Sequence, residues 1–499
     1  MAKIAALVLP ARRAGELPAM LRDVVDMLCI GGAPAPATWT SVGRDACVAL
    51  AHVGPDPLNR VAQPVTDDQS RSTVLCGYVL PDDSGGDASP GVTRLARAVG
   101  TRGDDALPTL DGVFAFAQWD ARRERLLAGV DKLGMRPLYW TAVPGGGFAV
   151  ATEIKALVAL RGDAVRVNWT AWQEQLALGY QLGDHTLVEG IERFGAAQVL
   201  DCDGASHALR TTEHFLESIE EAPMGREEFL EANHALFLSA MRRCDALRDR
   251  SVRPVLTISG GLDSRRILGW MLRHSAAPEL FTVPTVSADG SEIESGIVRH
   301  LARQLDLDAF QVRVPTGDDL QLTRSVRDLG CDFETDEHAV YAATALSIRR
   351  PDAVNFDGLA GDTLINPGNF LRHEYLAEGG DERFLASITP DISWVNIPGD
   401  RPPLRERIAG LWAPLRGQRN RYTIWALDTR GRRELALGPM TLQANAFESL
   451  YPYLERDFVR LALRLPPRER IGTLLQRPLI ARLGVAALDE TPSTREAST

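Results

Sequence analysis

Short apolar runs separated by Gly, Pro and Asp turns make up most of the first 205 residues. Runs of this length between turn residues are typical of strands in antiparallel sheets. A helix is expected to begin near residues 151–157. We therefore predict a strand-rich α+β domain over residues 1–205. Its expected strands are 3–9, 46–52, 73–80, 112–119, 125–131, 137–142 and 147–151.

The pattern changes after residue 205. A helix is expected at 226–248, and beyond it apolar strands alternate with helices. Such alternation predicts a parallel, doubly wound sheet, in which ligands bind at the carboxyl ends of the strands. From residue 380 onward helices dominate, so residues 206–499 are expected to form a second domain. The expected strands are 255–258, 280–286, 309–314 and 353–356, and the helices that alternate with them are 265–274, 293–305 and 336–349.

The strand 255–258 runs into residues 259–264, Ser-Gly-Gly-Leu-Asp-Ser, and then into a helix. Backbone N–H groups converge where a strand, a glycine turn and a helix N-terminus follow one another, and the helix dipole adds partial positive charge. Ser264 is placed to cap the helix. Asp263 adds a carboxylate, which is useful beside an anion when a divalent cation bridges the two. The loop therefore predicts an anion site; the alternative is an ordinary strand-to-helix turn.

A second loop with two glycines, residues 357–362 (Asp-Gly-Leu-Ala-Gly-Asp), follows the strand 353–356. Because the carboxyl ends of parallel strands meet at one edge of a sheet, we expect this loop to lie near residues 259–264. On its own, Asp362 would be interpreted as an Asp that closes a glycine turn.

Composition limits the classes of function. The chain has 499 residues and a net charge of −11 from 55 basic and 66 acidic residues, which argues against a general nucleic-acid binder. Six cysteines lie far apart without a Cys-x-x-Cys pair, as expected in a reducing cytosol rather than in a disulfide scaffold or a structural zinc site. No apolar run approaches the roughly 20 residues of a membrane span, and the short apolar start has no clear secretory cleavage site. We therefore expect a cytoplasmic protein without membrane contact.

Two stretches together resemble one family. Residues 259–264 match the pyrophosphate loop of the ATP-pyrophosphatase superfamily at every position. Residues 110–139, which include Asp-Gly-Val-Phe-Ala-Phe and Gly-Met-Arg-Pro-Leu-Tyr, closely resemble the glutaminase domain of class II glutamine amidotransferases. In this order the two stretches resemble the asparagine synthetase superfamily. The resemblance implies an N-terminal Ntn-hydrolase-like αββα sandwich and a C-terminal parallel sheet of the ATP-pyrophosphatase (adenine nucleotide α-hydrolase-like) type with added helices.

The resemblance also implies the ligands. It implies that ATP is split into AMP and pyrophosphate, and that Asp263 and Asp362 share Mg²⁺, which offsets the charge on departing pyrophosphate. Adenosine would rest near Leu256 and Val283, largely against the backbone. The residues implied to bind ATP are Leu256, Ser259, Gly260, Gly261, Leu262, Asp263, Ser264, Val283, Gly358 and Gly361.

The chain departs from the family in its N-terminal half. Residue 2 is Ala where the family has its nucleophilic Cys, and Ala cannot form a thioester. Residues 76–80 lack the Glu and Asn of the family's glutamine-binding stretch, and the later acidic motif is not recognisable around 85–105. We therefore expect residues 1–205 to be inactive as a glutaminase. Cys76 is a candidate substitute nucleophile, but a core cysteine on a strand is favoured.

Two catalytic roles of the family lack their usual residues. Leu359 stands three residues before Asp362, where members often place a Glu or Tyr base, and Leu cannot accept a proton. No Lys follows Lys155, and Arg495 lies about where the family's late Lys is expected, either as a catalytic cation or as part of a solvated tail. The candidates for the base are Glu334, Asp336, His338 and Glu374.

Without ammonia from glutamine, the amine must come from a substrate. This combination resembles the branch of the family that includes β-lactam synthetases, carbapenam synthetases and lasso-peptide cyclases. It implies an AMP-forming carbon–nitrogen ligase of specialised metabolism, such as antibiotic biosynthesis, that closes a macrolactam or β-lactam ring. The alternatives are an intermolecular amide ligase, an ammonia-dependent asparagine synthetase and a non-catalytic ATP-binding partner protein. The substrate is expected to be a small molecule or a precursor peptide, with room for a partner protease or carrier protein.

Overall fold

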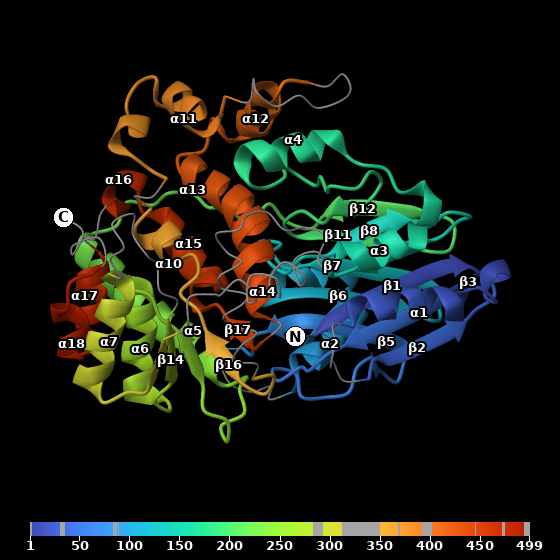
Figure 1. The fold of residues 1–499 in the computed structure, drawn as a ribbon, viewed down its shortest axis with the longest axis horizontal. Coiled ribbons are helices and arrows are strands. Elements are labelled where there is room, and N and C mark those ends of the chain that lie inside the picture. The colour runs from blue at the N-terminus through green and yellow to red at the C-terminus, as the bar shows by residue number, and fades with distance from the viewer. Residues whose placement is uncertain are drawn as a thin grey trace.

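The computed structural model describes residues 2–29, 35–82, 87, 89–282, 293–311, 350–367, 370–391, 402–444, 446–471 and 475–493. Figure 1 shows a strand-rich N-terminal part, blue to green, beside a part in which helices surround a smaller sheet. The described residues form three sheets, two of them in the N-terminal part.

The first sheet is antiparallel, with β9 and β1 at its centre. Its order is β10-β8-β9-β1-β3-β2, with β1 (Lys3–Pro10), β2 (Ala37–Val42), β3 (Ala46–Val53), β8 (Tyr139–Ala142), β9 (Phe148–Ala151) and β10 (Glu192–Arg193). The second sheet is also antiparallel. Its order is β12-β11-β7-β6-β5-β4, with β4 (Val65–Thr66), β5 (Arg71–Val79), β6 (Gly112–Asp120), β7 (Arg125–Val130), β11 (Gln198–Cys202) and β12 (His207–Thr211).

The two sheets pack face to face between helices. In β1, Ile4 and Val8 contribute to the core between the sheets, whereas Ala5 and Leu7 pack with α1 and α3. Both faces of the strand are therefore covered, which explains why β1 is apolar throughout rather than alternating. The layers run helix, sheet, sheet, helix: α1 (Leu17–Leu28) and α3 (Ile154–Arg161) cover the first sheet, and α2 (Gly91–Arg102) covers the second.

Each strand predicted in the first 205 residues is present, with its ends shifted by one or two residues. The strands not predicted are β2, β4, β10 and β12, which lie at sheet edges, and β11, which lies between β7 and β12. Because β12 pairs with β11, the second sheet extends past the domain boundary predicted at residue 205.

The third sheet is parallel, as predicted. Its order is β15-β14-β13-β16-β17. The predicted helix 336–349 and the ends of two predicted strands, residues 283–286 and 312–314, lie outside the described residues. The elements of this sheet are β13 (Val255–Thr257), α6 (Leu262–His274), β14 (Glu279–Thr282), α7 (Ile293–Leu305), β15 (Ala309–Gln311), β16 (Val354–Phe356) and β17 (Glu448–Leu450).

Helices dominate the rest of the second part, as expected. They are α5 (Arg226–Asp245), α10 (Gly361–Ile365), α11 (Gly380–Ile388), α12 (Leu404–Trp412), α13 (Arg421–Ala426), a π-helical segment (Leu427–Met440), α14 (Thr441–Gln443), α15 (Arg456–Arg464), α16 (Pro467–Arg470), α17 (Gln476–Ala481) and α18 (Ala486–Glu490). The N-terminal part has one further helix among its described residues, α4 (Trp169–Leu178), which follows α3. Short 3₁₀ turns lie at Ala11–Arg13, Gly103–Thr109, Gly162–Ala164, His373–Leu376, Ala413–Leu415 and Pro452–Leu454. None of the helices among the described residues is long and apolar enough to cross a membrane.

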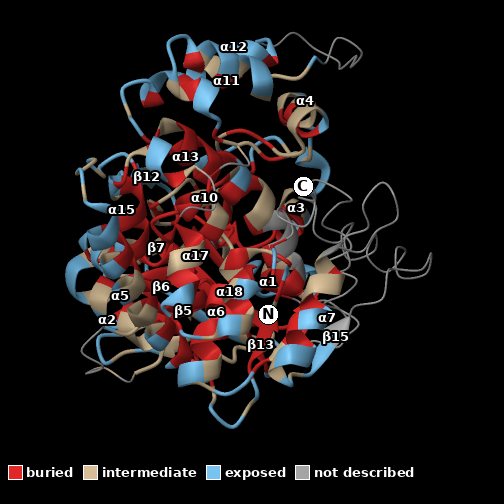
Figure 2. Cartoon of the chain, turned by 90° about the vertical axis from the view of Figure 1, so that its left-hand side faces the viewer, coloured by how far each residue is buried: buried red, intermediate tan, exposed pale blue. Residues whose placement is uncertain are grey.

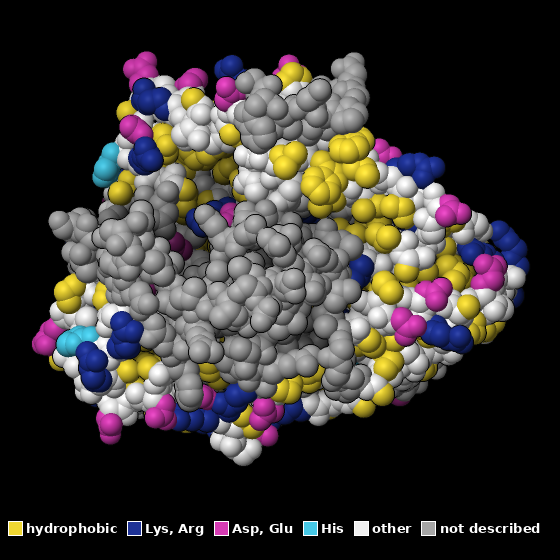
Figure 3. Space-filling model, in the orientation of Figure 1, with side chains coloured by type: hydrophobic (Ala, Val, Ile, Leu, Met, Phe, Trp, Pro, Cys, Tyr) yellow, Lys and Arg dark blue, Asp and Glu magenta, His cyan; other side chains and the backbone are white. Residues whose placement is uncertain are grey.

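Buried residues fill the sheets and the region where the two parts meet, while outer helices such as α12 carry exposed ones (Figure 2). On the face shown in Figure 3, basic and acidic side chains are interspersed over the described residues, and hydrophobic side chains gather near α4, which carries the exposed Trp169 and Leu176. A large basic patch of the kind that binds nucleic acid is not seen on the described surface of this face.

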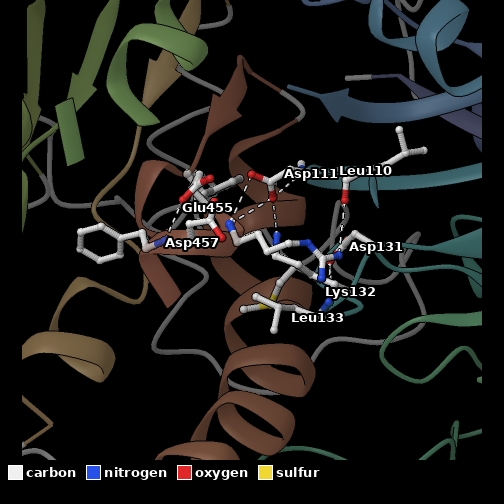
Figure 4. A network of polar contacts seen from close by, with 12 residues as sticks. Leu110, Asp111, Asp131, Lys132, Leu133, Glu455 and Asp457 are labelled. Atoms are coloured by element: carbon white, nitrogen blue, oxygen red, sulfur yellow. Dashed lines mark hydrogen bonds and ion pairs between the residues drawn. The ribbon is translucent and has the colours of Figure 1, made fainter. Parts of the chain in front are cut away.

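Polar contacts also join the two parts. Asp111, which precedes β6, accepts hydrogen bonds from Lys132 Nζ at 2.7 Å and from Arg243 Nη1 of α5 at 3.2 Å. Arg243 Nη1 also donates to Glu455 at 2.7 Å, and Glu455 accepts from the N–H of Phe458 at the start of α15 (Figure 4). Glu455 therefore both caps α15 and ties it to the N-terminal part.

Candidate active site

The loop 259–264 lies between β13 and α6, at the carboxyl end of a central strand. The helix begins at Leu262, so the prediction that Ser264 caps it is wrong: Ser264 lies within its first turn. The Ser264 hydroxyl instead accepts from the N–H of Ser259 at 3.2 Å, and the Ser259 hydroxyl accepts from the N–H of Gly261 at 3.1 Å. These two hydrogen bonds fold the loop back over the start of α6, where the first-turn N–H groups and the helix dipole favour an anion.

The residues of this loop differ in their access to solvent. Ser259 is exposed and Asp263 is partly exposed, whereas Gly260 and Ser264 are buried. Leu256 is fully buried within β13. Val283 lies outside the described residues, just after β14 ends at Thr282.

The second loop, residues 357–362, packs directly against the first. A Cβ atom at Gly361 would lie 2.5 Å from Asp263 Cγ, and a Cβ at Gly358 would lie 3.2 Å from Ser264 N. Both glycines therefore allow a backbone approach that a larger residue would prevent. Asp362 follows Gly361 in the first turn of α10, and its carboxylate accepts from the N–H of Thr363 at 2.7 Å. The structure thus brings Asp263 and the loop that carries Asp362 to the same edge of the sheet.

Sequence reasoning missed a third segment at this edge. Gln476, the first residue of α17, donates from Nε2 to Asp263 Oδ1 at 2.5 Å, and the Tyr453 hydroxyl donates to the main-chain oxygen of Asp263 at 3.0 Å. Gln476 Oε1 accepts from Asn366 Nδ2 at 3.4 Å. Gln476 and Tyr453 lie 213 and 190 positions from Asp263 along the chain, so the sequence around the loop gives no sign of either contact.

The end of the described chain also lies at the first loop. The fully buried Arg265 guanidinium donates to the oxygens of Gly260 at 2.9 Å, Thr491 at 2.6 Å and Pro492 at 2.7 Å. It joins the glycine turn to residues 491–492. Arg495, the predicted substitute for the family's Lys, lies outside the described residues.

Of the four residues predicted as candidates for the general base, only Glu374 lies among the described residues. Glu374 is exposed on a 3₁₀ turn next to Arg372, and Glu334, Asp336 and His338 lie outside the described residues. Sequence reasoning missed Asp357, which follows β16 in the same loop as Leu359. Asp357 is partly buried and accepts from the N–H of Leu359 at 2.9 Å, and its burial raises its pKa to about 6.

Cys76 lies in the core between the two antiparallel sheets, as favoured from the sequence. Its thiol is fully buried on β5 and donates to the main-chain oxygen of Ala2 at 3.0 Å. Burial raises the pKa of the Cys76 thiol to about 12, so the nucleophilic thiolate is disfavoured. The interpretation of Cys76 as a core residue is confirmed.

The donor set at the two loops suits Mg²⁺. Among the described residues, no group of three or more His, Cys, Asp or Glu side chains is placed to hold a metal ion. Asp263 and Asp362, on adjacent loops, match the one or two protein carboxylates that usually bind Mg²⁺ where phosphates and water supply its other ligands.

Two family models match the chain, in the order of the two parts. The glutamine amidotransferase domain matches residues 92–214, and asparagine synthase matches residues 237–483. The second match includes both loops and Gln476.

Several asparagine synthetases match parts of the chain. Asparagine synthetase 3 (glutamine-hydrolysing) of Bacillus subtilis is 30% identical over 191 residues, which cover 38% of this chain and 30% of the relative. A candidate glutamine-hydrolysing asparagine synthetase of Mycobacterium bovis is 28% identical over 224 residues, covering 43% and 34%. The glutamine-hydrolysing asparagine synthetase of Cricetulus griseus is 24% identical over 370 residues, covering 72% and 57%. The chain thus spans about a third of the length of the first two and just over half of the third.

Among solved structures, the glutamine phosphoribosylpyrophosphate amidotransferase of Bacillus subtilis, in complex with ADP and GMP, matches with 11% identity and a TM-score of 0.31, covering 73% of this chain and 77% of that one. A TM-score this low supports no conclusion about function.

Proposed function

Because the chain belongs to the asparagine synthetase superfamily, we propose that it is an ATP-dependent, amide-forming ligase. A substrate carboxylate attacks the α-phosphorus of ATP, and pyrophosphate leaves to give an acyl-adenylate. An amine then attacks the acyl carbon, and AMP leaves as the amide forms. The observation that carries the proposal is the direct contact between the two loops, which gathers the carboxylate of Asp263 and the loop of Asp362 beside the N-terminus of α6.

In this proposal, different residues of the two loops bind the phosphates and the metal ion. The N–H groups at the start of α6 bind pyrophosphate, and Arg265 holds the carbonyl oxygen of Gly260 on the buried side of the turn, away from the anion. Asp263 and Asp362 would hold Mg²⁺, which supplies positive charge against the phosphates when it is bound.

The second step needs a proton acceptor for the amine, and we propose Asp357. It belongs to the loop in which Leu359 occupies the usual position of the base. The backbone N–H of Leu359 fixes its carboxylate at 2.9 Å. A pKa near 6 keeps Asp357 ionised at neutral pH while making it a stronger base than an exposed Asp.

The amine, in this proposal, belongs to the substrate. The described cysteines of the N-terminal part are buried or partly buried, and burial raises the pKa of Cys29, Cys47, Cys76 and Cys202. A domain without an accessible thiolate supports the absence of glutaminase activity. Ring closure of the lasso-macrolactam or β-lactam type is preferred over ammonia-dependent asparagine synthesis because Leu359 stands in place of the usual base. Intermolecular amide ligation and a non-catalytic ATP-binding role are the remaining alternatives.

The test is the release of AMP and pyrophosphate from ATP and Mg²⁺ in the presence of a small-molecule and peptide extract of the source organism. Wild type is compared with Asp263→Asn and with Asp457→Asn, which removes an exposed carboxylate of α15 as a control. We expect wild type and the control to release both products and Asp263→Asn to be slower by about a hundredfold or more, because a metal ligand supports several kcal/mol of transition-state stabilisation.

The mass of the consumed compound then distinguishes the reactions. Loss of water from one molecule indicates ring closure, joining of two molecules indicates ligation, and a gain equal to ammonia minus water indicates ammonia-dependent synthesis. ATP binding without product release by the wild type would overturn the proposal and favour a non-catalytic role.

A further inference from the structure

Gln476 connects the two loops of the candidate site. Its side chain is 7% exposed and lies at the start of α17, so it is held by packing rather than free in solvent. Its amide nitrogen donates to Asp263 Oδ1 at 2.5 Å, and its amide oxygen accepts from Asn366 at 3.4 Å. The N–H of Asn366 in turn donates to the main-chain oxygen of Asp362 at 2.8 Å. One amide thus bridges the segments that carry the two carboxylates.

The amide of Gln476 donates hydrogen bonds from its nitrogen and accepts them at its oxygen, so its two ends suit different partners. A carboxylate only accepts hydrogen bonds, so the amide nitrogen of Gln476 must face Asp263 and its oxygen must face Asn366. A donor at Oδ1 restrains the rotation of the Asp263 carboxylate, and the same carboxylate lies close against the backbone of Gly361, where an added Cβ would lie 2.6 Å from Oδ1. A hydrogen bond to an ionised group is about twice as strong as one between neutral groups.

We propose that Gln476 is a positioning residue that holds Asp263 and Asp362 in register for a shared divalent cation. This inference rests on the proposed function, because it assigns Gln476 to the same cation. It predicts that Gln476 affects the binding of ATP through the cation and has little effect on the binding of ATP alone.

The experiment measures the dissociation constant of ATP by calorimetry, once with Mg²⁺ and once with EDTA, for the full chain. Gln476→Met keeps the length and apolar volume of the side chain but removes both amide contacts. Gln118→Met is the matched control: Gln118 is 5% exposed and donates to Thr73 Oγ1 at 2.9 Å and to the oxygen of Ala96 at 3.1 Å in the N-terminal part.

In Gln476→Met we expect ATP to bind about tenfold more weakly with Mg²⁺, as the loss of one hydrogen bond to a charged group implies, and within about twofold of wild type with EDTA. Gln118→Met should bind as wild type does in both conditions. A third variant, Gln476→Glu, adds a carboxylate beside Asp263. It should bind Mn²⁺ more tightly than wild type in the absence of ATP, as followed by the paramagnetic resonance signal of free Mn²⁺.

A loss of ATP affinity by the same factor with and without Mg²⁺ would show that Gln476 only supports the fold of the site, and would overturn the inference. An unchanged affinity in Gln476→Met would overturn it as well. The ATP affinity of the wild type, measured with and without Mg²⁺, distinguishes a failure of the role proposed for Gln476 from a failure of the proposed function. If wild-type affinity for ATP does not depend on Mg²⁺, the role proposed for Asp263 and Asp362 fails together with that of Gln476.

Discussion

Asp357 is the residue of the second loop whose ionisation is most altered by folding. Its pKa rises from 3.8 to about 6 because the carboxylate is buried. Since the folded state holds the proton more tightly than the unfolded state, stability from this group is fully present below about pH 3.8 and is lost as the pH rises through about 6. At neutral pH the ionised Asp357 therefore destabilises the fold, as expected when a group is retained for chemistry rather than for packing.

We predict that Asp357→Asn raises the free energy of unfolding at pH 8 by about 1–3 kcal/mol relative to wild type, and that this gain disappears towards pH 4. Asn keeps an oxygen that accepts from the N–H of Leu359, so the loop can retain its conformation. Urea unfolding at pH 4, 6 and 8, followed by circular dichroism, checks this pH dependence. If Asp357 is the base, the same variant should lose amide formation while it is stabilised. A variant that is less stable than wild type at pH 8 would contradict the argument.

At the scale of the elements, the site depends on how closely two loops approach. The strand ends of β13 and β16 are neighbours in the parallel sheet, and this pairing brings the two loops together. The remaining distance is set by the glycines, because a Cβ at Gly361 would lie 2.5 Å from Asp263 Cγ, closer than non-bonded carbon atoms can approach. The position of Asp263 is therefore coupled to the size of residue 361.

We predict that Gly361→Ala displaces the Asp263 carboxylate, destabilises the protein by about 1–3 kcal/mol and weakens binding of ATP with Mg²⁺ by at least about tenfold. Thermal unfolding and calorimetric ATP titration check the two effects. Gly410→Ala in α12 is the matched control, because an added Cβ there meets no atom within 4 Å. The control should be as stable as wild type or gain up to about 1 kcal/mol from the better helix propensity of Ala. Unchanged ATP affinity in Gly361→Ala would show that the loops are not coupled in this way.

The elements also show what could be predicted from the sequence. Strands with both faces buried, such as β1 and β3, have apolar runs that mark them clearly. The edge strand β12 has mostly exposed residues and therefore lacks this signal. The two loops were found because their residues are consecutive. The contacts of Gln476 and Arg265 depend on how α17 and the chain end fold back onto the loop, and a local pattern contains no such information.

At the scale of the whole molecule, charged groups bind the two parts together. Burial and the neighbouring Asp111 raise the pKa of Glu455, and Lys132 and Arg243 lower that of Asp111 against the effect of its burial. Arg243 pairs with a carboxylate of each part, Asp111 and Glu455, in the network of Figure 4. A second ion pair, between Arg136 of the N-terminal part and Glu448 of β17, is 4% and 3% exposed. The N-terminal part is thus joined to the third sheet by a buried ion pair.

We predict that Arg136→Met lowers the free energy of unfolding by about 3–5 kcal/mol, because it leaves the Glu448 carboxylate buried without this partner. The double variant Arg136→Met, Glu448→Leu should recover part of this loss, since a buried ion pair that is replaced by apolar residues of similar size often leaves stability unchanged. The exposed pair of Arg460 and Asp457 provides the control: Arg460→Met should change stability by less than about 1 kcal/mol. Urea unfolding followed by tryptophan fluorescence and circular dichroism measures the stability of all three variants.

The same ion pair should also affect ATP binding, because β17 is the edge strand beside β16, which leads into the second loop. We expect Arg136→Met to weaken ATP binding and the double variant to restore it. If the double variant were as unstable as the sum of its two single variants, the pair would not act as the link between the two parts.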